Sequence, residues 1–282
     1  MIHEMPILQD SSPELRKNLL DLFSVASLRE AFKAGGLKKG EIIKNQADSD
    51  DQTQIDTVAQ FIDDYLETCK QHVYVFEGQT VLPTTIFSGE PLGATGSSTL
   101  FVTEVNFDVF TLSPPTQNSV SFLWPVRVEM IETYLVVRFI TLEKSMSALF
   151  GESIRVIGRS LSEESILEDW GLTTGLRADL NKGVKALWAT DWFDCTKGRY
   201  KKSYSVSQDS MDAGRGIKGE YPEVYEAMML APIQNSVFEL KDSKFQSLAF
   251  SVDPTDGRIR FPTYTSLGVT DAVIQRIIAA NC

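Results

Sequence analysis

The alternation in residues 120–130, VSFLWPVRVEM, decides the fold class. Every second residue is apolar and the residues between are mainly polar. The apolar set is Val120, Phe122, Trp124, Val126, Val128 and Met130. A period of two predicts a strand with one buried face. Pro125 falls on the other face, which favours an edge strand or a bulge because proline lacks an amide N–H.

Similar stretches lie on both sides of this strand. Thr99–Leu112 and Tyr134–Leu142 are rich in Val, Phe and other strand-forming residues, and Val73–Phe76 is a shorter apolar run. Gly89–Ser98 is rich in Gly and Ser and predicts a loop. Consecutive strands with short connections predict an antiparallel meander.

Residues 1–70 have helical patterns. Ser12 precedes Pro13, the arrangement of an N-cap before a proline at the first helical position. A second short helix is predicted over Leu28–Lys33, with Ser27 as its cap. Gln46–Thr53 is polar and predicts a loop. The apolar stripe that follows predicts a helix reaching Cys69, and its members are Ile55, Val58, Phe61, Ile62, Tyr65, Leu66 and Cys69.

The C-terminal half mixes helices and strands. Helices are predicted after Ser162, from Thr173 or Thr174 through Trp188, from Pro222 to Met229 and over Thr270–Ala280. Strands are predicted at Ser236–Lys241, Phe245–Val252 and Arg258–Thr263, the last two joined by a turn at residues 253–257. The predicted class is α+β. Three regions are expected: helical residues 1–70, antiparallel β residues 71–143 and mixed residues 144–282. The third region and the preceding strands could also form one domain and share one sheet.

The small number of histidines and cysteines limits the metal sites that this chain could form. The 282 residues include only two histidines, His3 and His72, and three cysteines, Cys69, Cys195 and Cys282. No CxxC or HExxH occurs, which argues against zinc sites and leaves no metal or other cofactor predicted. The sequence also shows no signal-peptide pattern and no run of about 18 apolar residues, so we expect a cytoplasmic protein without a membrane partner.

The most unusual feature is a basic segment over Lys197–Lys218. Hydrophobic residues make up 43% of the chain, and 27 lysines and arginines against 38 aspartates and glutamates give a net charge of −11. The basic segment carries +4, so the rest carries −15. Its candidate binding residues are Lys197, Arg199, Tyr200, Lys201, Lys202, Tyr204, Arg215 and Lys218. Gly198, Gly214, Gly216 and the adjoining Gly219 suggest a mobile loop. Arg258 and Arg260, two apart on a predicted strand, extend the basic set.

Such a segment suits a non-catalytic binding or assembly component. Lysine and arginine neutralise phosphates and tyrosine stacks on bases, but a basic segment on an acidic protein also docks an acidic protein surface. Of these two partners we expect a protein rather than nucleic acid. A solvated loop that balances the chain's own acidic faces is the plain alternative. The oligomeric state is not predicted.

Two further motifs offer enzymatic readings. Glu239 and Lys241 form an E-x-K on a predicted strand, the arrangement of Mg²⁺-dependent nucleases or phosphohydrolases, but the upstream aspartate is missing. An exposed ion pair is the ordinary explanation. Residues 214–219, GRGIKG, match G-x-G-x-x-G, but the polar residues 207–213 before them do not predict the strand that a dinucleotide site requires.

Overall fold

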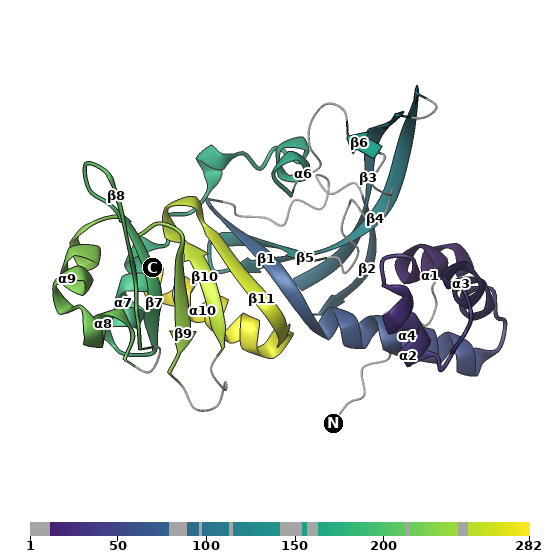
Figure 1. The fold of residues 1–282 in the computed structure, drawn as a ribbon, viewed down its shortest axis with the longest axis horizontal. Helices are drawn as coiled ribbons and strands as arrows, with labels where there is room; N and C mark the ends of the chain where they lie inside the picture. Colours follow the sequence, from purple (N-terminus) through teal and green to yellow (C-terminus); the bar gives the residue numbers. More distant parts are fainter. Residues whose placement is uncertain are drawn as a thin grey trace. The chain divides into compact units, whose positions relative to one another are not determined.

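The computed structural model describes residues 12–78, 89–95, 98–112, 115–141, 154–156, 163–212, 215–241 and 248–282. For residues 89–123 and 154–156, the described part is the backbone alone. The chain divides into two compact units. Unit 1 comprises residues 1–67, 84–126 and 140–171, and unit 2 comprises residues 68–83, 127–139 and 172–282. The predicted α+β class is confirmed (Figure 1).

Unit 1 begins with four helices, α1 (Pro13–Leu20), α2 (Val25–Ala31), α3 (Lys39–Ala47) and α4 (Gln52–Glu67). Ser12 caps α1 as predicted, because its side chain accepts a hydrogen bond from Leu15 N. The cap of α2 is Ser24, not Ser27, whose own N–H is the donor. The sequence pattern missed α3, which buries Ile42, Ile43 and Ala47.

The predicted helix to Cys69 stops two residues early. Glu67 ends α4 and β1 (Thr68–Glu77) starts directly afterwards. Cys69 therefore lies in a strand, where it pairs with Thr265 of β11. Burial raises the pKa of its thiol to about 11.

The meander is confirmed. Its described strands are β2 (Gly89–Thr95), β3 (Ser98–Leu112), β4 (Pro115–Ile131), β5 (Tyr134–Ile140) and the short β6 (Ile154–Val156), which pairs with β3. The predicted loop over Gly89–Ser98 is wrong, because β2 occupies most of it and pairs with β3. The edge position suggested by Pro125 is also wrong, since β4 has β3 and β5 as its neighbours.

The long helix expected from Thr173 or Thr174 is interrupted. After α6 (Glu163–Asp169), the chain forms a short turn, η1 (Thr174–Leu176), and only then α7 (Asn181–Ala189). The reason lies in tertiary hydrogen bonds. Ala178 N donates to Val75 O, and Leu180 N donates to Pro254 O. Neither amide is left for a helical bond, so α7 starts after them. Ser162 and residues 142–153 lie outside the described residues.

Unit 2 holds one antiparallel sheet. Its C-terminal strands are β7 (Phe193–Lys201), β8 (Ser205–Asp209), β9 (Ser236–Leu240), β10 (Ala249–Asp253) and β11 (Arg258–Ser266). The order is β5-β1-β11-β10-β9-β7-β8. The predicted hairpin of β10 and β11 is confirmed, with the turn η3 (Pro254–Asp256) between the strands. Because β1 pairs with β11, the early and late strand groups share one sheet.

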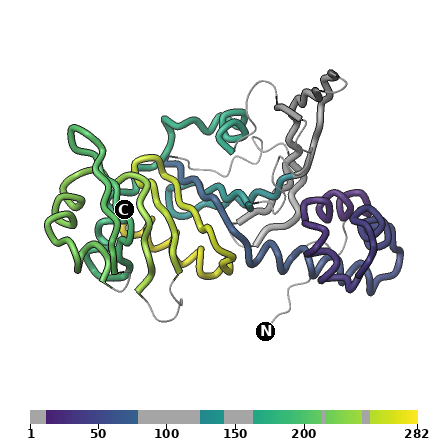
Figure 2. The backbone as a smooth tube through the Cα atoms, in the orientation of Figure 1, coloured from purple at the N-terminus to yellow at the C-terminus, as the bar shows by residue number. Residues whose placement is uncertain are grey.

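Helices α7 and α10 (Leu267–Asn281) pack together behind these strands, while α8 (Gly216–Glu220) and α9 (Pro222–Leu230) lie near β7 (Figure 2). A ladder of rings forms the core between the sheet and the helices. It consists of Phe193, Phe238, Phe250 and Phe261, with Trp188 against Phe238. Within the described part of the chain, no helix has the length and apolar character needed to cross a bilayer.

A buried ionic cluster joins α10 to the sheet. Arg138 of β5 is fully buried, and its guanidinium pairs with Glu129 of β4 and with Asp271 of α10. A buried arginine is tolerated only when carboxylates face it, so this cluster fixes how α10 sits on the sheet.

Candidate binding surface

The basic segment is not the mobile loop that the sequence suggested. Residues 197–209 belong to the β7–β8 hairpin, and α8 follows at Gly216. Alternation along β7 leaves Lys197, Arg199 and Lys201 exposed, while Gly198 and Tyr200 between them are buried. Three of the predicted cations therefore share one face of a strand.

The two candidate tyrosines have different environments. Tyr200 is 4% exposed and packs in the core of unit 2, so its ring is not available to a partner. Tyr204, in the turn of the hairpin, is 69% exposed. Lys202 lies over the Tyr200 ring, 5.6 Å from its centroid.

The glycines are required for packing rather than for mobility. A Cβ on Gly198 would lie 2.6 Å from Met228 Sδ and 2.8 Å from Ile217 Cδ1, so only glycine lets α8 and α9 approach β7. Gly216 has φ +63°, and a Cβ there would lie 2.3 Å from Asp194 Oδ2. Gly214 lies outside the described residues.

Arg215 and Lys218 are engaged elsewhere. Both flank Ile217, which packs against the buried side of β7. Arg215 pairs with Asp212, and Lys218 Nζ lies 2.6 Å from Asp191 Oδ1. The hydrogen bond to Asp191 raises the pKa of Lys218. These two cations are therefore separate from the face that carries Lys197.

Strand register brings Arg260 into line with Lys197 of β7. One row of paired residues crosses the sheet from β1 to β8: His72, Arg260, Ser251, Val237, Lys197 and Asp209. Neighbouring strands lie about 4.8 Å apart, so Arg260 and Lys197 are about 14 Å apart at the backbone. We call this side of β7, β9, β10 and β11 the open face. Its members are Lys197, Arg199, Lys201, Val237, Glu239, Ala249, Ser251, Asp253, Arg258 and Arg260.

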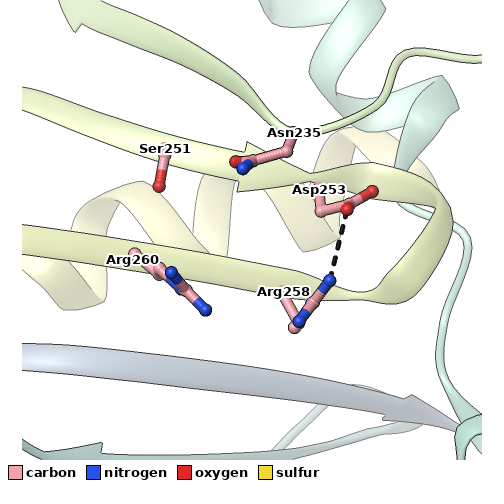
Figure 3. A pocket seen from close by; sticks show the side chains of 5 residues that line it. All are labelled: Asn235, Ser251, Asp253, Arg258 and Arg260. Atoms are coloured by element: carbon pink, nitrogen blue, oxygen red, sulfur yellow. Dashed lines mark hydrogen bonds and ion pairs between the residues drawn. The ribbon is translucent and has the colours of Figure 1, made fainter. Parts of the chain in front are cut away.

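A small pocket lies on the open face and is lined by Asn235, Ser251, Asp253, Arg258 and Arg260 (Figure 3). The space open to a water-sized group is about 20 Å³, which is room for about one such group. Figure 3 shows Arg258 and Arg260 side by side on β11, with Asp253 and Ser251 on β10.

The two arginines of the pocket differ in their partners. Arg258 Nη2 lies 3.4 Å from Asp253 Oδ2, and its Nε lies 2.6 Å from Asp256 Oδ2. Arg260 is exposed, and its side chain forms no hydrogen bond or ion pair with any residue that the structure describes. Burial raises the pKa of Asp253, while Arg258 and Arg199 act in the opposite direction.

Of the E-x-K pair, Glu239 lies in β9, and Lys241 follows the last residue of that strand. Glu239 pairs with Asp194 on one side and with Ala249 on the other. The Oδ1 atom of Asp194 accepts hydrogen bonds from Trp188 Nε1 and Cys195 N. Among the described residues, no group of three His, Cys, Asp or Glu could hold a metal ion. The Mg²⁺-dependent alternative built on Glu239 and Lys241 stays a prediction.

The G-x-G-x-x-G match has a strand upstream that the sequence did not predict, since β8 ends at Asp209. The strand does not run into the motif, and α8 is only five residues long. No protein-family model matches this sequence, and no curated protein or solved structure does so either.

Proposed function

We propose that this protein is a non-catalytic binding component that docks an acidic segment of a protein partner on the open face. The observation that carries the proposal is the shared orientation of Lys197, Arg199 and Lys201, in register with Arg260. The backbone of the sheet is already ordered before a partner binds, so the conformational entropy lost on binding is mainly that of the side chains.

The charge distribution supports this proposal. The chain carries −11 overall, so its general field repels an acidic partner. A local basic face then orients the partner and fixes where it docks, which is the main contribution of charge at interfaces.

A protein partner suits this surface better than nucleic acid does. Carboxylates of Asp253, Glu239 and Asp209 lie among the cations, and they would repel a continuous phosphate backbone. Exposed apolar side chains also lie near the β7–β8 hairpin in sequence. Lys201 N donates to Pro232 O, and this contact is flanked in sequence by Tyr204 and by Leu230, which is 89% exposed. Exposed aromatic and aliphatic groups beside charges are typical of protein interfaces.

The test is affinity capture from a lysate of the source cells with the wild-type protein and two charge-matched variants. The first variant is Lys197→Gln/Arg199→Gln/Lys201→Gln. The control removes three exposed lysines of unit 1, Lys17→Gln/Lys33→Gln/Lys44→Gln. We expect wild type and control to retain the same proteins, and the first variant to lose them. The retained proteins should elute with salt and resist nuclease treatment. Retention of the same proteins by all three, or their release by nuclease, would contradict the proposal.

A further inference from the structure

We infer that the pocket of Figure 3 binds one carboxylate from the acidic partner, with Arg260 as the residue that pairs with it. This inference rests on the proposed function. It adds an anchoring point within the open face and the chemical group that the anchor accepts.

Three of the side chains that line the pocket can donate hydrogen bonds. Arg260 contributes guanidinium N–H groups, Ser251 a hydroxyl and Asn235 an amide. None of the three side chains has a hydrogen-bond or ion-pair partner among the residues that the structure describes. Asp253 and Arg258 bond to each other and form the wall of the pocket (Figure 3). An incoming acceptor therefore meets uncommitted donors beside a neutralised ion pair.

The size of the pocket sets the size of the ligand. About 20 Å³ of the pocket is open to a water-sized group, which is room for one oxygen atom of a ligand such as a carboxylate. A guanidinium fork matches a carboxylate in a planar, two-bond geometry, which a side-chain Asp or Glu can supply from outside the pocket.

The neighbouring charges favour a single negative charge over a double one. Asp253 lines the pocket, and Asp256 Oδ2 lies 2.6 Å from Nε of Arg258. A phosphate dianion would meet these carboxylates at close range, and its repulsion would be twice that of a carboxylate. The pocket thus discriminates against phosphate while it accepts Asp or Glu.

The distance between Arg260 and Lys197 predicts the spacing of acidic residues in the partner. Arg260 and Lys197 lie about 14 Å apart across the strands, and an extended peptide advances about 3.3 Å per residue. A segment with acidic residues about four positions apart would therefore reach both cations. The anchor at Arg260 fixes the register, and Lys197 and Arg199 attract the flanking charge.

The test is an NMR titration of the ¹⁵N-labelled full chain at pH 8 and constant ionic strength, with acetate and inorganic phosphate as separate probes. We expect acetate to produce saturable shifts at the amides of Ser251 and Arg260, and phosphate to produce none there. Arg260→Gln should weaken acetate binding at least tenfold. Arg276→Gln, which removes an exposed arginine of α10, should leave it unchanged. The remaining signals of Arg260→Gln should superimpose on those of the wild type, which shows that it folds.

The outcomes separate the anchor from the proposed function. Equal acetate binding by wild type and Arg260→Gln, or the absence of saturable shifts, would overturn the anchor. Saturation by phosphate at the same amides would overturn its preference for a carboxylate. Capture of the partner by Arg260→Gln, together with its loss in the Lys197, Arg199 and Lys201 variant, would reject the anchor and keep the proposed function. Capture by both variants would reject both.

Discussion

The two faces of the unit 2 sheet use the same strands for different purposes. On the covered face, the ring centroids of Phe193 and Phe238 lie 4.9 Å apart, and those of Phe250 and Phe261 lie 5.9 Å apart. On the open face, the residues next to them in sequence include polar and charged ones, such as Ser251 and Arg260. One residue along each strand separates the groups that stabilise the fold from those available to a partner. Stability and binding should therefore respond to separate substitutions.

The largest expected effect is on the covered face. Phe250→Ala removes a fully buried ring that contacts Phe193, Phe238 and Phe261. We expect it to lower the free energy of unfolding by about 3–5 kcal/mol, measured by urea denaturation. Its neighbour on the open face provides the control, because Ser251→Ala should change stability by less than about 0.5 kcal/mol. Similar losses in both variants would remove the distinction between the faces.

A smaller effect is expected where the basic segment meets the covered face. Gly216→Ala introduces a Cβ against Asp194 at a residue with φ +63°. We expect a loss of about 1–3 kcal/mol, from backbone strain and from the displaced carboxylate. Gly219→Ala is the matched control in the same helix, since its Cβ would meet only Arg215 Cβ at 3.4 Å. Equal tolerance of both substitutions would support the mobile loop that the sequence suggested.

The smallest expected effect is that of Arg260→Gln on stability. Its guanidinium has no ion-pair partner in the described part of the chain. The free energy of unfolding should stay within about 0.5 kcal/mol of the wild-type value, as measured by thermal unfolding. A decrease of more than about 1 kcal/mol in the free energy of unfolding would show that Arg260 stabilises the fold. It would contradict the separation of stability and binding between the two faces.

Much of the fold followed from periodicity. Alternation in residues 120–130 predicted β4, and the apolar face of residues 273–278 predicted α10. The hairpin of β7 and β8 was missed because its exposed positions are lysine and arginine, while Gly198 takes the place of a core side chain. The start of α7 was missed because the amides of Ala178 and Leu180 bond to distant carbonyls. Such tertiary hydrogen bonds leave no local pattern.

The candidate surface was only partly predictable. Composition alone identified Lys197, Arg199 and Lys201 as unusual. Their alignment with Arg260 depends on the order of β7, β9, β10 and β11 in the sheet. No local sequence pattern predicts the order of strands in a sheet. Sequence inspection also grouped Tyr200 with the binding residues, although strand alternation turns its ring into the core.

The pairing of β1 with β11 has a consequence for synthesis. The residues of β1 meet partners at 258–266, far away along the sequence. During translation β1 therefore leaves the ribosome long before its partner strand exists, and the sheet of unit 2 closes only after β11 has been made. Contacts of such high sequence separation form slowly and leave an unpaired strand edge exposed in the meantime. The helices α1 to α4 make their contacts locally and are free to form while the ribosome is still at work.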